Sequence, residues 1–120
     1  MALKKIVLPL TVAAGGGGTA TAPNAVNGVL YSVEYVKTDY ADGVDFTVNC
    51  LNSGMTDLIM TVSNANASAR YYPRDDSHKA SDGSALSLNN MMIPIFGRPS
   101  ISVTSGGTST SGTFIIWILD

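Results

Sequence analysis

The chain has 120 residues and a formal charge of −2 at pH 7, and only 13 % of its residues are charged. This length fits one ordinary domain, and we expect a neutral surface rich in hydroxyl groups. Lysine and arginine number only seven together and do not cluster, which argues against nucleic-acid binding and against a polybasic membrane anchor. No run approaches the ~18 apolar residues that a membrane-spanning helix needs, so we expect a soluble protein.

The first segment, residues 1–14, has two lysines followed by an apolar run and superficially resembles a signal peptide. Pro9 interrupts the run. We interpret the segment as retained, either as an N-terminal arm that adds a strand to a neighbouring subunit or as an edge strand of its own sheet. Its candidate interface residues are Ile6, Leu8, Leu10 and Val12.

Residues 15–27 begin with four consecutive glycines and contain few side chains that could pack. Such a composition predicts a flexible tether. The sequence therefore divides into the N-terminal segment, this tether, and a folded domain over residues 28–120.

Strand patterns dominate residues 28–120, and helix signals are nearly absent. In residues 44–50 every second residue is apolar, which predicts a strand with one buried face. Residues 28–37 alternate less cleanly and are predicted to form a hairpin with that strand through the turn at 38–43. Further strands are predicted around 58–62, 91–96, 100–104 and 113–119.

About seven to eight short strands separated by Gly/Ser/Asn turns predict an all-β protein, an antiparallel β-sandwich. The pattern leaves jelly-roll-like and immunoglobulin-like strand orders open, because periodicity does not encode pairing. The single cysteine, Cys50, falls in the apolar register of its strand. We expect it to be a small core residue without a disulfide.

The C-terminal strand, 113–119, is apolar on both faces. Phe114, Ile116 and Ile118 share one face, and the residues between them are apolar too. The second face needs a cover, either from this chain or from a partner. Its residues are candidates for an interface: Ile115, Trp117 and Leu119.

Residues 70–74 hold the densest cluster of tyrosine and arginine, the residue types enriched at interface hot spots. The candidate interface residues here are Arg70, Tyr71, Tyr72 and Arg74. The alternative is that one tyrosine closes an end of the core and that Pro73 ends a strand.

No pattern of catalytic residues is present in the sequence. The only histidine, His78, lies in the charged stretch 74–79 without a nucleophile motif, which favours a solvated loop. Asp75 and Asp76 match no calcium-loop spacing, and one cysteine with one histidine is too few for zinc. We predict a protein that is not an enzyme and has no metal, no cofactor and no small-molecule substrate.

Four segments occur in a characteristic order: Arg-Tyr-Tyr-Pro-Arg at 70–74, Ile-Pro-Ile-Phe-Gly-Arg-Pro at 93–99, Val-Thr-Ser-Gly-Gly at 103–107 and Ser-Gly-Thr-Phe at 111–114. Over residues 28–120 the chain resembles small β-sandwich structural proteins of tailed-bacteriophage virions, the capsid decoration or cement proteins. The resemblance implies a homo-oligomer, in many such proteins a trimer, assembled in the host cytoplasm. On the virion it would bind the major capsid protein and stabilise the shell. A head–tail connector or tail component, and a carbohydrate-binding β-sandwich module, are the alternatives.

Overall fold

The structure, a computed structural model, describes the backbone of residues 2–52, 54–78 and 85–120, and their side chains except those of 76–78 and 85–90. In these ranges the chain forms ten strands and no helix, and every strand pair is antiparallel. The all-β antiparallel prediction is confirmed. The strands are β1 (Leu3–Thr11), β2 (Gly18–Thr21), β3 (Val26–Lys37), β4 (Val44–Asn52), β5 (Met55–Ala65), β6 (Ala69–Tyr71), β7 (Asp75–His78), β8 (Ala85–Met91), β9 (Ile93–Thr104) and β10 (Ser111–Leu119).

The strand pairing is nested along the chain. β1 pairs with β10, β2 with β9, β3 with β6, and β4 with β5. A chain that pairs its first strand with its last in this way has the jelly-roll order, the first of the two orders that the sequence left open. Lateral pairs join these strands into one eight-stranded sheet.

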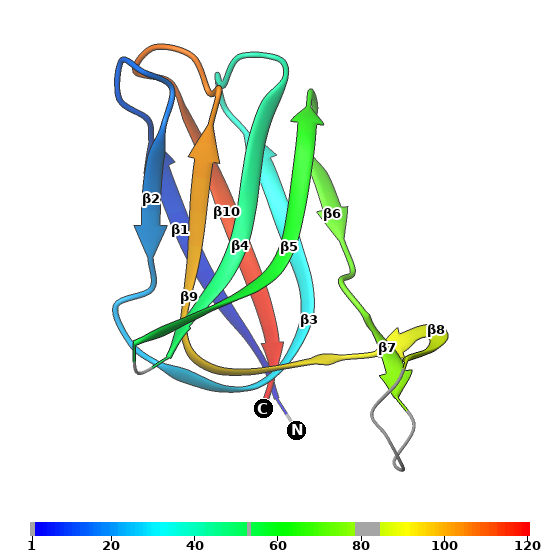
Figure 1. The fold of residues 1–120 in the computed structure, drawn as a ribbon. Helices are drawn as coiled ribbons and strands as arrows, with labels where there is room; N and C mark the ends of the chain where they lie inside the picture. Colours follow the sequence, from blue (N-terminus) through cyan, green and yellow to red (C-terminus); the bar gives the residue numbers. More distant parts are fainter. Residues whose placement is uncertain (1, 53, 79–84) are drawn as a thin grey trace.

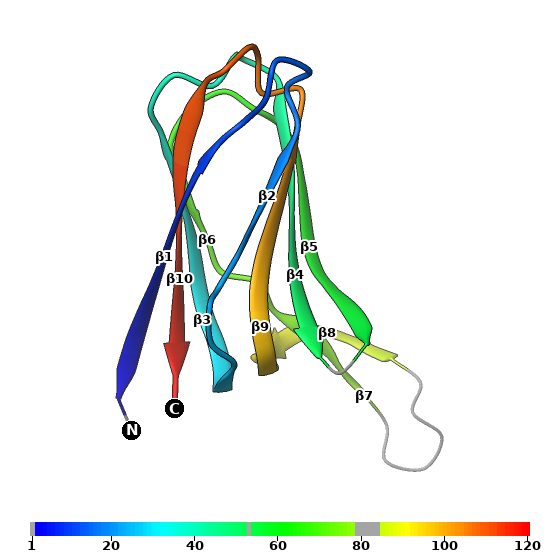
Figure 2. The same ribbon diagram turned by 90° about the vertical axis from the view of Figure 1, so that its left-hand side faces the viewer.

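Two groups of strands face each other across the core. Figure 2 shows β1, β10 and β3 on one side and β2, β9, β4 and β5 on the other. We call β1-β10-β3-β6 the first layer and β2-β9-β4-β5 the second layer; β9 also pairs with the first part of β3 and so links them. β7 and β8 form a separate hairpin that projects from one end (Figure 1).

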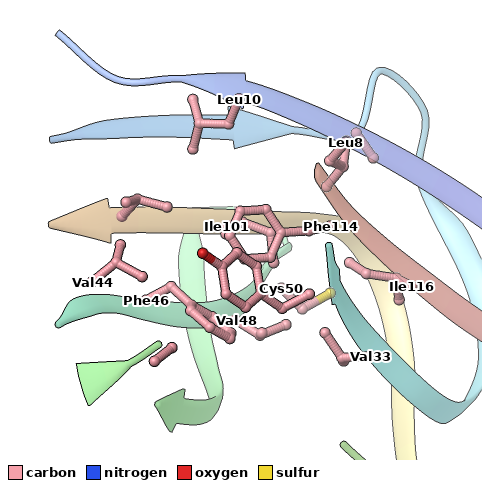
Figure 3. Packing of buried hydrophobic residues seen from close by; sticks show 14 of the residues in the cluster. Leu8, Leu10, Val33, Val44, Phe46, Val48, Cys50, Ile101, Phe114 and Ile116 are labelled. Carbon is pink, nitrogen blue, oxygen red and sulfur yellow. The ribbon is translucent and has the colours of Figure 1, made fainter. Parts of the chain in front are cut away.

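Aromatic rings from both layers meet in the core (Figure 3). The ring centroids of Phe114 in β10 and Phe46 in β4 are 4.9 Å apart, although their strands do not pair. Tyr35 in β3 stacks on Phe114 at 5.4 Å and lies 5.3 Å from Phe46. Contacts of this kind arise when one-sided strands bury their apolar faces against an opposing layer. Cys50 is buried in this core, as predicted.

Residues 2–27 belong to the body of the fold. β1 pairs with β10 along its whole length. The tether expected for residues 15–27 is wrong, because 18–21 form β2 beside β9 and β3 already begins at Val26. The glycines make a tight turn, in which Gly16 has a φ of 82°. Glycine allows this backbone conformation because it has no Cβ, so the segment forms an ordered turn and not a flexible tether.

The hairpin expected for residues 28–51 is also wrong. Among the described strands, β3 pairs with β10, β6 and β9, whereas β4 pairs with β5 and β9. The turn at 38–43 therefore carries the chain from one layer to the other. The physical reason is that both strands have an apolar face, and both faces are buried when the strands oppose each other across the core.

The strands expected at 91–96 and 100–104 are largely one strand. β9 runs from Ile93 to Thr104, pairing first with β3 and then with β4 and β2. Gly97 lies at the changeover with a φ of 151°, and a Cβ there would overlap the carbonyl oxygen of Leu51. Only glycine allows this close approach of β9 to the end of β4.

Candidate interaction surface

The apolar residues of the N-terminal segment point into the protein. Leu8, Leu10 and Val12 are each at most 9 % exposed and belong to the core, and Ile6 packs against it. Their assignment as interface candidates is wrong for Leu8, Leu10 and Val12, since the second layer covers the same face. The opposite face of β1 carries Val7, which is 47 % exposed.

The C-terminal strand has the two apolar faces that its sequence predicts. Phe114, Ile116 and Ile118 are buried in the core. Ile115, Trp117 and Leu119 are half-buried on the outer face of the first layer. Their cover comes from the strands on either side, since Ile115 lies between Val7 of β1 and Glu34 of β3.

A row of polar contacts crosses this outer face, with one residue from each strand of the first layer. The indole Nε1 of Trp117 donates a hydrogen bond to Glu34 Oε1 at 2.7 Å. Arg70 of β6 forms an ion pair with the same carboxylate. Lys5 Nζ of β1 lies 5.8 Å from the centroid of the Trp117 ring, within the range of a cation–π contact. We call these four residues the Trp117 row.

The electrostatics of the row follow from these contacts. The hydrogen bond from Trp117, and next the contacts with Arg70, lower the pKa of Glu34 below its ordinary value. Hydrogen bonds with Tyr72 and Glu34 raise the pKa of Arg70. The row therefore holds Trp117 in a fixed orientation through groups that stay charged at neutral pH.

The predicted cluster at 70–74 divides between the core and the surface. Tyr71 is half-buried, with its ring edge toward Phe46 at 6.1 Å, so it closes the core. Arg74 donates to the backbone oxygens of Tyr31 at 3.0 Å and Pro73 at 2.7 Å, which fixes the chain after β6. Tyr72 is 51 % exposed and packs edge-on against Tyr31.

The large apolar side chains that stay exposed gather at one end of the molecule. We call the base the end at which β1, β5 and β9 begin and from which the β7–β8 hairpin projects, and the top the opposite end (Figure 1). Eight large apolar residues are exposed in the described part of the chain, and five of them lie on segments at the base: Leu3, Met55, Leu58, Met91 and Phe96.

Sequence reasoning did not identify Met55 and Leu58 as surface residues because a bulge interrupts the β4–β5 pair. The register of β4 and β5 shifts between Val48 and Asn49, so Met60 pairs with Val48 over the core while Leu58 pairs with Asn49 on the outer face. The four residues at 55–58 are all exposed. The sequence does carry one signal of this exposure, because apolar and polar residues do not alternate before residue 58.

A hollow of about 300 Å³ lies beside β1 at the base. One wall is the strand itself, and the other is the connection from β2 to β3. The lining is mainly apolar: Lys5, Ile6, Val7, Ala22, Pro23, Asn24 and Val26.

The described residues contain no group of three His, Cys, Asp or Glu side chains placed to hold a metal ion. The side chains of Asp76 and His78 lie outside the described part. Burial raises the pKa of the Cys50 thiol, which keeps it protonated at neutral pH. Within the same described ranges, no helix is long and apolar enough to cross a membrane. The chain matches no protein-family model, no curated protein and no solved structure.

Proposed function

We propose that this chain is a structural protein of a tailed-phage virion, a decoration or cement protein that binds the major capsid protein on the shell surface. The setting rests on the resemblance of residues 28–120 to such proteins. The observation that supports a docking role is the gathering of exposed apolar side chains at the base. Large apolar side chains that stay exposed are typical of protein-binding surfaces.

The rest of the surface suits a protein that docks by one end. The outer face of the second layer carries a row of hydroxyl side chains, Thr19, Ser102, Thr47 and Thr61, on four adjacent strands. Thr19 and Ser102 lie within hydrogen-bond distance of each other at 3.4 Å. A neutral hydroxyl-covered face stays hydrated and does not promote association, which argues against docking through this face.

The direct test is reconstitution on capsids from phage particles in which mass spectrometry detects the chain. Purified protein should co-sediment with capsids stripped of it. Phe96→Ser, which removes an apolar ring that is 54 % exposed at the base, should weaken binding at least tenfold, as expected for an interface anchor. Deleting residues 1–22 is not a suitable test, because it removes β1 and β2 from the sheet.

Val36→Ser is the matched control, since Val36 is 39 % exposed near the end of β3 at the top. It should bind like the parent protein. Equal binding by the Phe96 and Val36 variants would refute docking through the base. Density at the neck or tail in a particle reconstruction would instead support the connector or tail alternative.

A further inference from the structure

β1 presents an unpaired strand edge whose hydrogen-bonding groups can be assigned by residue. Val12 N donates to Thr110 O, and Asp120 N donates to Ala2 O. Antiparallel ladders alternate, so even-numbered residues of β1 bond to β10 and odd-numbered residues turn their N–H and C=O to the open edge. Pro9 is odd-numbered and has no N–H. The edge can therefore pair with a further strand over residues 3–7.

The hollow beside β1 opens along this same stretch. Lys5 and Val7 line it and also supply the free backbone groups, and Ile6, Ala22 and Val26 give it an apolar lining. A volume of about 300 Å³ accommodates one side chain of the size of leucine or methionine. An added strand could thus bond to the edge while one of its apolar side chains enters the hollow.

The start of β5 has the chemistry that this edge would bind. Among the described strands β5 pairs only with β4, so it is the other free end of the strand order. Its first residues are exposed on both faces: Met55 at 69 %, Leu58 at 65 %, with Thr56 and Asp57 between them. The segment is extended, apolar and acidic, whereas the β1 edge is apolar and carries Lys4 and Lys5.

We propose that copies of this chain associate head to tail, with residues 55–58 of one copy added as a strand along residues 3–7 of the next. Leu58 or Met55 occupies the hollow, and Asp57 lies near the lysines. Figure 2 shows the start of β1 and the start of β5 on opposite sides of the base, so the contact joins two molecules. A head-to-tail contact of this kind builds a ring or an open chain of subunits.

The lysines and Pro9 also explain why the β1 edge pairs selectively and not with every strand that it meets. Lysine and proline on an edge strand discourage indiscriminate pairing. Here Pro9 limits the pairing to five residues, and the positive charge selects a strand that carries a carboxylate. Lys4 forms an ion pair with Asp120 at 2.6 Å, whereas Lys5 lies over the Trp117 ring, so Lys5 is the main partner for Asp57.

This association goes beyond the proposed capsid binding and is tested without capsids. Sedimentation velocity of the full chain, from about 1 μM to about 1 mM, should show oligomers. Lys5→Glu and Asp57→Lys should each weaken association about five- to tenfold, since each replaces an attractive pair by a repulsive one. The double variant Lys5→Glu/Asp57→Lys should restore it.

Val7→Pro tests the backbone contribution. It removes one N–H from the open edge and leaves the bonds to β10 in place, as Pro9 already does, and it should weaken association at least tenfold. Far-UV circular dichroism checks that the variant folds. If Val7→Pro does not fold, the double variant Lys5→Glu/Asp57→Lys still tests the association. Phe96→Ser should leave association unchanged, so loss of capsid binding and loss of self-association are separable.

Three results would overturn the inference. The first is a protein that stays monomeric over the whole concentration range. The second is charge variants that associate like the parent chain, and the third is a double variant that is not rescued. Weakening by Asp57→Lys alone, with Lys5→Glu silent, would indicate that two β5 edges pair with each other.

Discussion

The top and the base of this jelly roll differ in how their connections are held and in how much apolar surface they expose. At the top the connections between strands are tied to one another: Ala41 N donates to Gly106 O at 2.8 Å, and Gly106 N donates to Gly16 O at 2.9 Å. Ser111 N donates to Asp39 Oδ1 at 2.6 Å. At the base, apolar side chains are exposed and a hairpin projects. The comparison indicates that hydrogen bonds between connections stabilise the top, whereas the base keeps large apolar side chains exposed.

Tyr40 is the residue that joins the top to the core. It is 2 % exposed, its ring stacks with Tyr35 at 6.1 Å, and its hydroxyl donates to Leu10 O at 2.6 Å. Burial raises its pKa to about 12, so the hydroxyl keeps its proton and the hydrogen bond over the whole neutral range.

The largest expected effect therefore comes from breaking the top. Tyr40→Ala should lower the free energy of unfolding by about 3–5 kcal/mol, because it opens a cavity among aromatic rings and removes the bond to Leu10. Tyr40→Phe keeps the ring and should cost about 1–2 kcal/mol. Urea denaturation of both variants checks the order, and equal losses would contradict a packing role for the ring.

Gly97 is the next most sensitive position and lies toward the base, where β9 changes partners. Gly97→Ala should lower the free energy of unfolding by about 1–3 kcal/mol, because the backbone conformation is strained for alanine and the added Cβ overlaps the carbonyl oxygen of Leu51. Gly15→Ala is the control, since nothing lies within 4 Å of an added Cβ there. Thermal unfolding should show a clear loss for Gly97→Ala and almost none for Gly15→Ala.

Acid should release the Trp117 row. The folded pKa of Glu34 is lowered, so its bonds stabilise the fold above the unfolded pKa of about 4.3 and are lost as pH falls through the folded value. Trp117 is the only tryptophan, so its fluorescence reports this step directly. Glu34→Gln should abolish the acid-dependent change, and its persistence in that variant would assign it to another group.

The smallest stability effects are expected for exposed residues at the base. Phe96→Ser should change the free energy of unfolding by about 0.5 kcal/mol or less, as is usual for surface substitutions. The same denaturation measurement, made beside Val36→Ser at the other end, checks this. A loss above about 2 kcal/mol would show that Phe96 supports the fold and would make it unsuitable as a probe of binding.

Sequence periodicity located strands well where one face is buried and failed where a bulge intervenes. The strand at 44–50 appears as expected, with Phe46, Val48 and Cys50 in the core. In β3, strict alternation would place Val29, Tyr31, Val33 and Tyr35 on one face. A bulge opposite residues 117 and 118 instead places Leu30, Val33 and Tyr35 in the core. A one-residue shift reverses every side chain beyond it, and periodicity carries no trace of the partner that causes the shift.

The candidate site shows the same division. The two faces of β10 could be read from the alternation of residues 113–119, because both are apolar over the whole strand. The orientation of β1 could not, since Ile6, Leu8, Leu10 and Val12 form an apolar face that would suit either a neighbour or the chain's own core. Only pairing with β10 places that face inward.

The sequence by itself determined that this chain is an all-β protein with a neutral surface, a buried cysteine and a C-terminal strand apolar on both faces. These properties depend on neighbouring residues along one strand. The tertiary structure decided the jelly-roll order, the incorporation of residues 2–27 into the body of the fold, and the exposure of Met55, Leu58 and Phe96 on segments at the base. Each of these features depends on pairing between strands that are far apart in the sequence. The alternation of side chains along one strand does not indicate which strand is its partner.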